Sequence, residues 1–189
     1  ACTNHFYAWA VPFIWVIPQE VAQRGAHIFV EENLRRIPPQ SVDPTVKNYH
    51  WGDMTAALFN ALDAGYDTTV LLDANGYITE GPGFNIFAVV DGKVLTPRSG
   101  MLEGISRKTV LEICADLGIP CAEADISLAE FLSADEVFTA TTAGGPVPVT
   151  RVNKTILGND AIGPITAQLL KTYWDWHSRD DLTEKITYL

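Results

Sequence analysis

The sequence predicts a mixed α/β fold of the α+β kind, and two observations carry this prediction. Short apolar segments typical of strands flank Asn-Gly and Asp-Gly dipeptides, which are the strongest local signals of β-hairpins. Between and after these segments, apolar residues recur three and four positions apart, as they do on one face of a helix. The 189 residues contain no internal repeat and suffice for one sizeable domain, or for one domain and part of another.

Residues 1–19 carry no charged side chain, so a membrane or signal segment has to be considered. Pro12 and Pro18 interrupt the apolar run, no basic residue precedes it, and its polar residues come first. These features disfavour a membrane segment. The aromatic and β-branched content instead predicts a buried strand that leads into a linker near residues 18–25.

The following stretch predicts one strand and one helix. A strand begins near Ala26 and ends at the Pro38-Pro39 break, and a helix of about residues 49–64 ends at Gly65. The apolar face of this helix comprises Met54, Leu58, Ala61 and Leu62.

The second half of the chain predicts two hairpins followed by helices and strands. The hairpins turn at Asn75-Gly76 and at Asp91-Gly92. A helix starts near Ser106, a short one covers about 127–133, strands follow over 136–145 and 147–156, and a last helix runs from Pro164 to near His177. The inward face of the first of these helices comprises Val110, Ile113, Cys114 and Leu117.

Composition excludes several classes of function. A net charge of −10 argues against binding to nucleic acids or anionic membranes, because both need a basic surface. Three cysteines without a CxxC pair and four scattered histidines predict neither a disulfide framework nor a metal site. We therefore expect a reduced, cytoplasmic protein without a bound metal.

The common nucleotide and hydrolase motifs are absent. No Gly-rich phosphate loop with Gly-Lys-Ser/Thr occurs, no GxGxxG follows a strand, and no GxSxG elbow is present. Two other segments could hold a phosphate. Gly104-Ile105-Ser106 opens a helix, where free N–H groups attract anions, and Thr141-Thr142-Ala143-Gly144 ends a strand. Taken singly, Ser106 is better explained as an ordinary N-cap, and the threonines as ordinary strand-end residues.

Among the six lysines, Lys47 stands out because Val46, Tyr49 and Trp51 flank it just before an apolar helix. Desolvation would disfavour its charged form, as an amine needs in order to bond with a carbonyl. A buried structural ion pair is an equal alternative. Glu80, in "TEGPGFNIF", precedes a Gly-Pro-Gly corner and could by itself be a solvated turn residue.

Together, four segments resemble the fold-type IV family of pyridoxal-phosphate (PLP) enzymes. This family includes branched-chain and D-amino-acid aminotransferases, aminodeoxychorismate lyase and (R)-selective amine transaminases. The matching segments are "PTVKNYHW", "TEGPGFNIF", "LEGISRKTV" and "TATTAGGPVPVT", in the family's order over residues 47–150.

The resemblance implies a role for each matched residue. Lys47 would form the Schiff base with PLP, and Glu80 would meet the pyridine nitrogen. Ile105 and Ser106 would bind the phosphate, with Leu102 against the ring. Thr142, with Thr141 beside it, would add a further phosphate contact. Trp51, Ala143 and Gly144 are weaker candidates for the substrate pocket, and Trp51 is as well explained as a core aromatic.

The family also implies parts that are not among these residues. A small N-terminal domain would supply a phosphate-binding arginine and much of the substrate pocket, partly across a homodimer interface. Arg35, Arg36 and Arg107 do not match that arginine's motif. We therefore expect residues 1–18 to be the end of the small domain and the linker, and residues 19–189 to be the large PLP-binding domain.

Details within the motifs, including "VKNYHWGD", "TEGPGFN" and "TTAGG", most resemble the (R)-amine transaminases. The implied reaction moves an amino group from an (R)-configured primary amine to a keto acid such as pyruvate. The alternatives are a branched-chain or D-amino-acid aminotransferase, a related lyase, or a non-catalytic binding domain that kept the fold.

Overall fold

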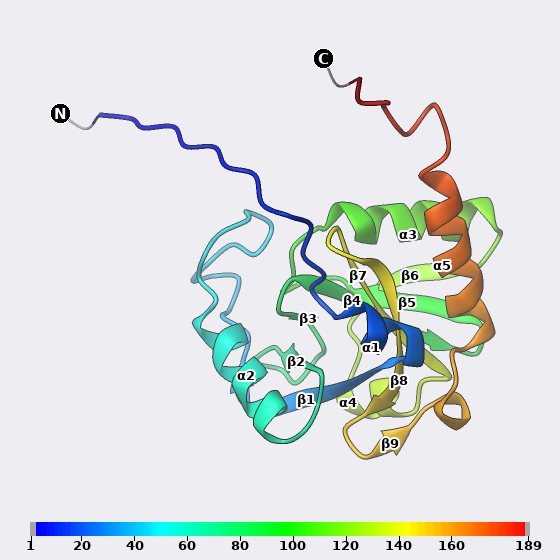
Figure 1. Ribbon diagram of the computed structural model, residues 1–189. Coiled ribbons are helices and arrows are strands. Elements are labelled where there is room, and N and C mark those ends of the chain that lie inside the picture. Colours follow the sequence, from blue (N-terminus) through cyan, green and yellow to red (C-terminus); the bar gives the residue numbers. More distant parts are fainter. Residues whose placement is uncertain (1–2, 188–189) are drawn as a thin grey trace.

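The structure, a computed structural model, describes residues 3–187, and within them the strands form one mixed, nine-stranded sheet. The main strand order is β2-β1-β8-β7-β4-β5-β6, with β3 paired to β4 and β9 to β8 (Figure 1). The strands are β1 Ala26–Arg35, β2 Thr68–Leu72, β3 Glu80–Gly81, β4 Phe84–Val90, β5 Lys93–Pro97, β6 Cys121–Ala124, β7 Glu136–Thr141, β8 Gly145–Val152 and β9 Thr155–Ile156. The helices are α1 Gln19–Arg24, α2 Gly52–Asp63, α3 Ile105–Asp116, α4 Leu128–Leu132 and α5 Pro164–Trp176, with a 3₁₀ turn at Gly158–Asp160. The mixed α/β prediction is confirmed.

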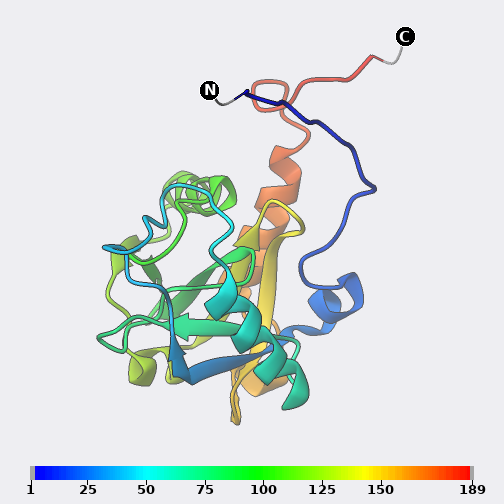
Figure 2. The same cartoon turned by 90° about the vertical axis from the view of Figure 1, so that its left-hand side faces the viewer.

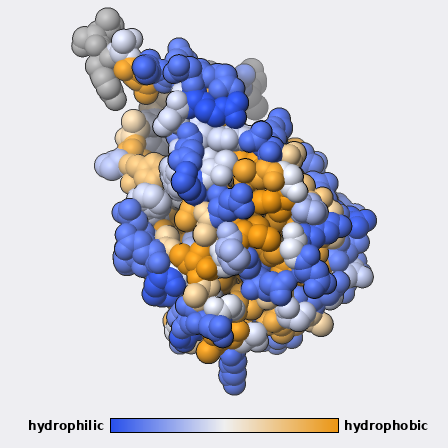
Figure 3. Space-filling view, turned by 90° about the vertical axis from the view of Figure 1, so that its right-hand side faces the viewer, coloured by the Kyte–Doolittle hydropathy of each residue, from blue (hydrophilic) through white to orange (hydrophobic). Residues whose placement is uncertain are grey.

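Both faces of the sheet are buried around β4, β7 and β8, so these strands carry apolar residues at consecutive positions. Successive side chains of a strand point to opposite faces, and in β4 Ile86 joins the core next to α1 and α4, whereas Phe87 joins the core under α3 and α5. Phe87 stacks on Phe138 of β7 with ring centroids 4.7 Å apart. The side of the molecule that bears α5 shows apolar residues framed by hydrophilic ones (Figure 3).

The hairpin predicted at Asp91-Gly92 is confirmed. Both residues have positive φ, as the turn that matches the twist of a tight hairpin requires, and β4 pairs antiparallel with β5. The hairpin at Asn75-Gly76 is only partly formed. Its turn is present, but beyond it a single bridge joins Leu72 to Ile78, with the Asp73 N–H donating to the Tyr77 carbonyl and the Thr79 N–H to the Leu71 carbonyl.

The buried strand predicted within residues 1–19 is wrong. Residues 3–14 form an extended coil that stands away from the sheet (Figure 2), and Phe6 and Trp9 are 91% and 79% exposed. Ile17 is the first buried residue, and the six-residue helix α1 lies where a linker was expected. The described residues place no strand beside this segment, so its backbone has no ladder to join.

The predicted helix over 49–64 is shorter at its N-terminus. The Trp51 N–H donates to the Tyr49 carbonyl in a turn, and α2 begins at Gly52. Its buried stripe is Met54, Ala57 and Ala61, while the predicted core residue Leu62 is 49% exposed. The predicted inward face of α3 is confirmed at Val110, Ile113 and Cys114, whereas Leu117 is half-buried at the helix end.

Among residues 3–187, each helix is too short or too polar to cross a bilayer. The same residues contain no group of three or more His, Cys, Asp and Glu side chains placed to hold a metal ion. Cys114 and Cys121 are free thiols, and Cys2 lies outside the described residues.

Candidate active site

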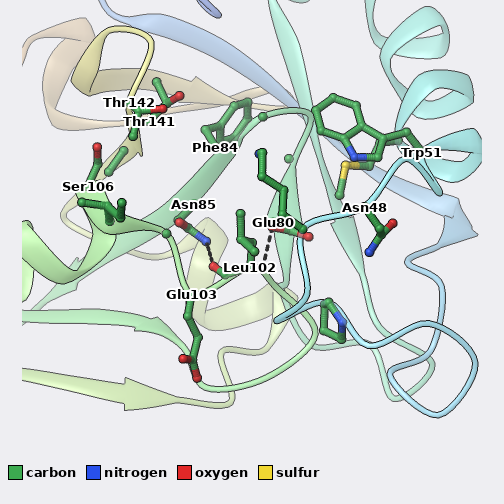
Figure 4. Close-up of a pocket in the computed structure, with 18 of the residues that line it drawn as sticks. Asn48, Trp51, Glu80, Phe84, Asn85, Leu102, Glu103, Ser106, Thr141 and Thr142 are labelled. Carbon is green, nitrogen blue, oxygen red and sulfur yellow. Dashed lines mark hydrogen bonds between the residues drawn. The ribbon is translucent and has the colours of Figure 1, made fainter. Parts of the chain in front are cut away.

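A cavity of about 410 Å³ opens where the loop after β1, the β3–β4 corner, the start of α3 and the end of β7 converge (Figure 4). Eight of the ten predicted site residues line it: Lys47, Trp51, Glu80, Leu102, Ile105, Ser106, Thr141 and Thr142. These residues are far apart in sequence, so the sheet pairings and the helix packing bring them together.

Two predicted pocket residues do not line this cavity. Gly144 faces Trp15 in a second cavity of about 460 Å³, and the Ala143 carbonyl accepts a hydrogen bond from the Val16 N–H at 3.0 Å. The chain turns between Thr142 and Gly144, so consecutive residues of this loop face different sides.

Glu80 is buried in the cavity wall and held at both oxygens. Its Oε2 accepts the Leu102 N–H at 3.0 Å, and its Oε1 accepts Nε of Arg36 at 3.2 Å. Burial raises the pKa of Glu80 above its ordinary value, while the Leu102 N–H and the Arg36 guanidinium act in the opposite direction. Because both partners are donors, the geometry suits a carboxylate, and the solvated-turn alternative is excluded.

Arg36 is a site residue that sequence reasoning missed. It is 5% exposed, lines the cavity, and bridges Glu80 to Asp53, whose Oδ2 accepts from its Nη1 at 2.8 Å. The signal available in the sequence was weak: a second arginine directly after a strand, before a Pro-Pro break. Asp53 also accepts the Ile37 N–H, so it fixes the chain where it leaves β1.

The start of α3 presents polar groups to the cavity. Gly104 is the N-cap, so Ser106 is not an ordinary N-cap, and its buried hydroxyl instead bonds to Tyr173 Oη at 3.0 Å. In the described residues the first backbone bond of α3 is from Lys108 N–H to the Gly104 carbonyl, which leaves the preceding N–H groups without helical partners. Such a helix start attracts anions.

Asn85 fixes the segment that leads into α3. Its Nδ2 donates to the Leu102 carbonyl at 2.7 Å, and a Cβ at Gly104 would lie 2.2 Å from its Oδ1. Glycine is therefore required at 104. Asn85 pairs with Glu80 across β3–β4 and with Ala140 across β4–β7, so one strand register places Glu80, Leu102 and Thr141 around the same space.

Lys47 lines the cavity from the loop between β1 and α2, but its side chain is exposed. The expected desolvation by flanking residues is wrong for the described chain, because Tyr49 is 98% and Val46 62% exposed. The buried ion pair considered as its alternative is likewise not formed within residues 3–187.

The site thus combines a primary amine, a buried carboxylate and an anion-binding helix start in one cavity. The carboxylate and the helix start lie apart across it, with Leu102 between them in the close-up (Figure 4). This arrangement can hold a ligand that has an anionic group at one end and a hydrogen-bonding or basic nitrogen at the other.

Comparison with known proteins gives a consistent result. The family described as amino-transferase class IV matches residues 12–152. A probable branched-chain-amino-acid aminotransferase of Thermotoga maritima is 38% identical over 143 residues, which cover 75% of this chain and 52% of that protein.

Solved structures agree with the sequence match. A branched-chain amino acid aminotransferase from T.th., complexed with N-(5'-phosphopyridoxyl)-L-glutamate, superimposes with a TM-score of 0.81 at 30% identity, over 86% of this chain and 55% of that one. The branched-chain aminotransferase of Thermoproteus uzoniensis with norvaline gives a TM-score of 0.80 at 31% identity, over 91% and 57%. The chain therefore spans about half the length of these relatives.

Proposed function

This chain belongs to the amino-transferase class IV family, and from that premise we propose that it is the cofactor-binding part of a PLP-dependent transaminase. The observation that carries the proposal is the meeting of Lys47, Glu80 and Ser106 in one cavity. An amine, a carboxylate and a helix start are the three groups that the aldehyde, the ring nitrogen and the phosphate of PLP each require.

The residues present fit this cofactor. The start of α3 and the Ser106 hydroxyl match a phosphate, and Thr142 faces the same side of the cavity (Figure 4). Glu80 is fixed by two donors and can accept a hydrogen bond from a protonated ring nitrogen. Leu102 and Trp51 provide apolar surface for a ring. When bound, PLP supplies an aldehyde that bonds with amines and a ring that withdraws electrons.

The chain's own residues would then have distinct tasks. Lys47 Nζ would bond to the cofactor and, once released by the substrate amine, would move the proton at the substrate carbon as general base and then acid. Glu80 would keep the ring nitrogen protonated. The first turn of α3 would fix the tilt of the ring by holding its phosphate.

For the substrates, we propose an (R)-configured primary amine as donor and a keto acid such as pyruvate as acceptor. The segments "VKNYHWGD", "TEGPGFN" and "TTAGG" support this choice. Within residues 3–187, the cavity's cationic side chains are Lys47 and Arg36, and Arg36 is occupied by Asp53 and Glu80. This wall offers no free guanidinium, so the carboxylate of the keto acid, like that of an amino-acid donor, would be bound outside it, and the choice of donor rests on the segments alone.

A branched-chain amino-acid donor is the second candidate, and the names of the similar proteins favour it. Turnover of (R)-1-phenylethylamine, leucine and D-alanine, each with pyruvate or 2-oxoglutarate as acceptor, separates the candidates. We expect the (R)-amine to be the best donor and its (S)-enantiomer to be inert. A higher kcat/KM for leucine would replace the first candidate by the second.

We expect Glu80→Gln to retain PLP but to slow proton abstraction about 10²–10³-fold, because the ring nitrogen loses its charged partner. Single-turnover reaction with the amine donor measures this step directly. Unchanged turnover would exclude Glu80 from stabilising the ring, and Glu103→Gln, an exposed residue at the same cavity, is the matched control.

Glu80→Gln should also change how the free energy of unfolding of the cofactor-free protein depends on pH. The folded-state pKa of Glu80 is raised above 4.5, so the folded state binds its proton more tightly than the unfolded state does. The wild type therefore loses stability relative to Glu80→Gln as the pH rises from that value through the folded-state pKa. Urea unfolding of both proteins at about pH 4 and about pH 8 measures the difference.

The proposal includes a homodimer with a shared active site, a cytoplasmic location, and a division of the chain at residue 18. The homodimer and the division at residue 18 rest on the family resemblance, and the location rests on the three cysteines without a CxxC pair. A non-catalytic role on the same fold would be supported by failure of the purified protein to bind PLP.

A further inference from the structure

Tyr173 does not touch the cavity itself, but it is hydrogen-bonded to Ser106, which lines the cavity. It lies in α5, is 7% exposed, and does not line the cavity, yet its hydroxyl is 3.0 Å from Ser106 Oγ at the start of α3. The two residues are 67 positions apart. This is the one hydrogen bond of either hydroxyl to another described residue.

The position of the Tyr173 ring is closely defined. A Cβ at Gly145 would lie 2.8 Å from its Cε1, and Trp174 and His177 pack around it with ring centroids 5.5 Å and 5.1 Å away. Gly145 has a φ of +68° and follows the loop that bears Thr141 and Thr142. The phenol is therefore held by the same loop that closes one side of the cavity.

The direction of the hydrogen bond follows from counting protons. Each hydroxyl has one proton. If Ser106 donated to Tyr173, the buried phenol proton would lack an acceptor among the described residues, and a buried unpaired donor is costly. If Tyr173 donates, the Ser106 proton stays free at the cavity wall, where an anion can accept it. In addition, two hydrogen bonds in a chain that ends on an anion polarise and strengthen each other.

We propose that Tyr173 is a positioning residue that donates to Ser106 and thereby aims the Ser106 hydroxyl proton at an anionic group bound at the start of α3. This rests on the proposed function in taking that group to be the cofactor's phosphate. The selectivity of the site for phosphorylated over unphosphorylated pyridoxal would then depend partly on a side chain that never contacts the ligand.

The test measures binding rather than turnover. Dissociation constants of PLP and of pyridoxal are compared in the wild type, Tyr173→Phe, Ser106→Ala and the double variant. We expect Tyr173→Phe to weaken PLP binding about three- to tenfold and to leave pyridoxal binding unchanged. In the Ser106→Ala background it should add less than about twofold, because the two residues act as one unit.

Phosphorus NMR gives a readout that a structural role would not change. Weakening the Ser106 hydrogen bond to the phosphate should raise the apparent pKa of bound PLP's phosphate in Tyr173→Phe, and removing that bond in Ser106→Ala should raise it by at least as much. Tyr77→Phe, on the turn before β3, is the matched control and should match the wild type in both measurements.

The outcomes separate the two proposals. If the wild type binds PLP and Tyr173→Phe binds it equally well, or if the two variants are additive, the positioning role is wrong while the proposed function stands. If the wild type does not bind PLP, the proposed function fails, and heat stabilisation by inorganic phosphate replaces PLP as the probe. Equal stabilisation of the wild type and Tyr173→Phe, or none of either, then overturns the role of Tyr173.

Discussion

Lys47→Ala is expected to abolish the visible absorption of the lysine-bound cofactor and to lower turnover roughly 10⁴-fold or more, because both the covalent bond and the proton carrier are lost. Lys47 lies at the cavity on a loop without regular structure and is exposed, so the substitution should not change the free energy of unfolding appreciably. Absorbance before and after borohydride measures the bond, and steady-state turnover measures the activity.

Two matched variants sharpen this result. Lys47→Arg keeps the positive charge but cannot give up its proton, so it should be as inactive as alanine. Lys154→Ala removes an exposed lysine from the turn between β8 and β9 and should behave as the wild type. A borohydride-sensitive band that survives in Lys47→Ala would assign the bond to another residue.

Arg36→Met is expected to destabilise the cofactor-free protein by about 3–5 kcal/mol, the loss typical of breaking a buried ion pair from one side. The arginine and Asp53 are almost fully buried, and Glu80 is 5% exposed. Without the guanidinium, the two largely buried carboxylates of Asp53 and Glu80 would be left without their shared positive partner. Equilibrium unfolding in urea measures the loss.

The cause of that loss can be checked by neutralising one acid. Adding Asp53→Asn to Arg36→Met should restore part of the stability, because one uncompensated charge is removed. Arg151→Met breaks an exposed pair with Asp160 and should have little effect by comparison. A loss no larger in Arg36→Met than in Arg151→Met would show that the buried network contributes little.

The sequence predicted most elements because their local signals agree with their environment. The Asp91-Gly92 turn needs two positive φ angles and lies between the mostly apolar segments of β4 and β5, so the pattern and the turn chemistry point to one structure. α3 follows in the same way from its apolar stripe, and α5 from the proline in its first turn. The residues of the site were found through four spaced motifs, and eight of them meet in one cavity.

What the sequence could not predict depends on contacts between distant residues. Nothing local to Arg36 indicates that it meets Glu80, because that contact depends on β1, β3 and the entry to α2 converging. Tyr173 looks like a core aromatic until its hydroxyl is placed beside Ser106. Residues 3–14 have the composition of a strand, but composition does not provide the neighbouring strand that the backbone needs.

The pairing of β1 with β8 has a consequence for how the protein folds during synthesis. Ala26 lies opposite Val149, and the Val30 N–H donates to Asn153, 123 positions later. The first strand therefore cannot take its final place between β2 and β8 until nearly all of the sheet has left the ribosome. Such long-range closure is slow, and partly made chains expose apolar strand edges meanwhile. We expect the yield of native protein to depend more on chaperones and growth temperature than on the stability of the finished fold.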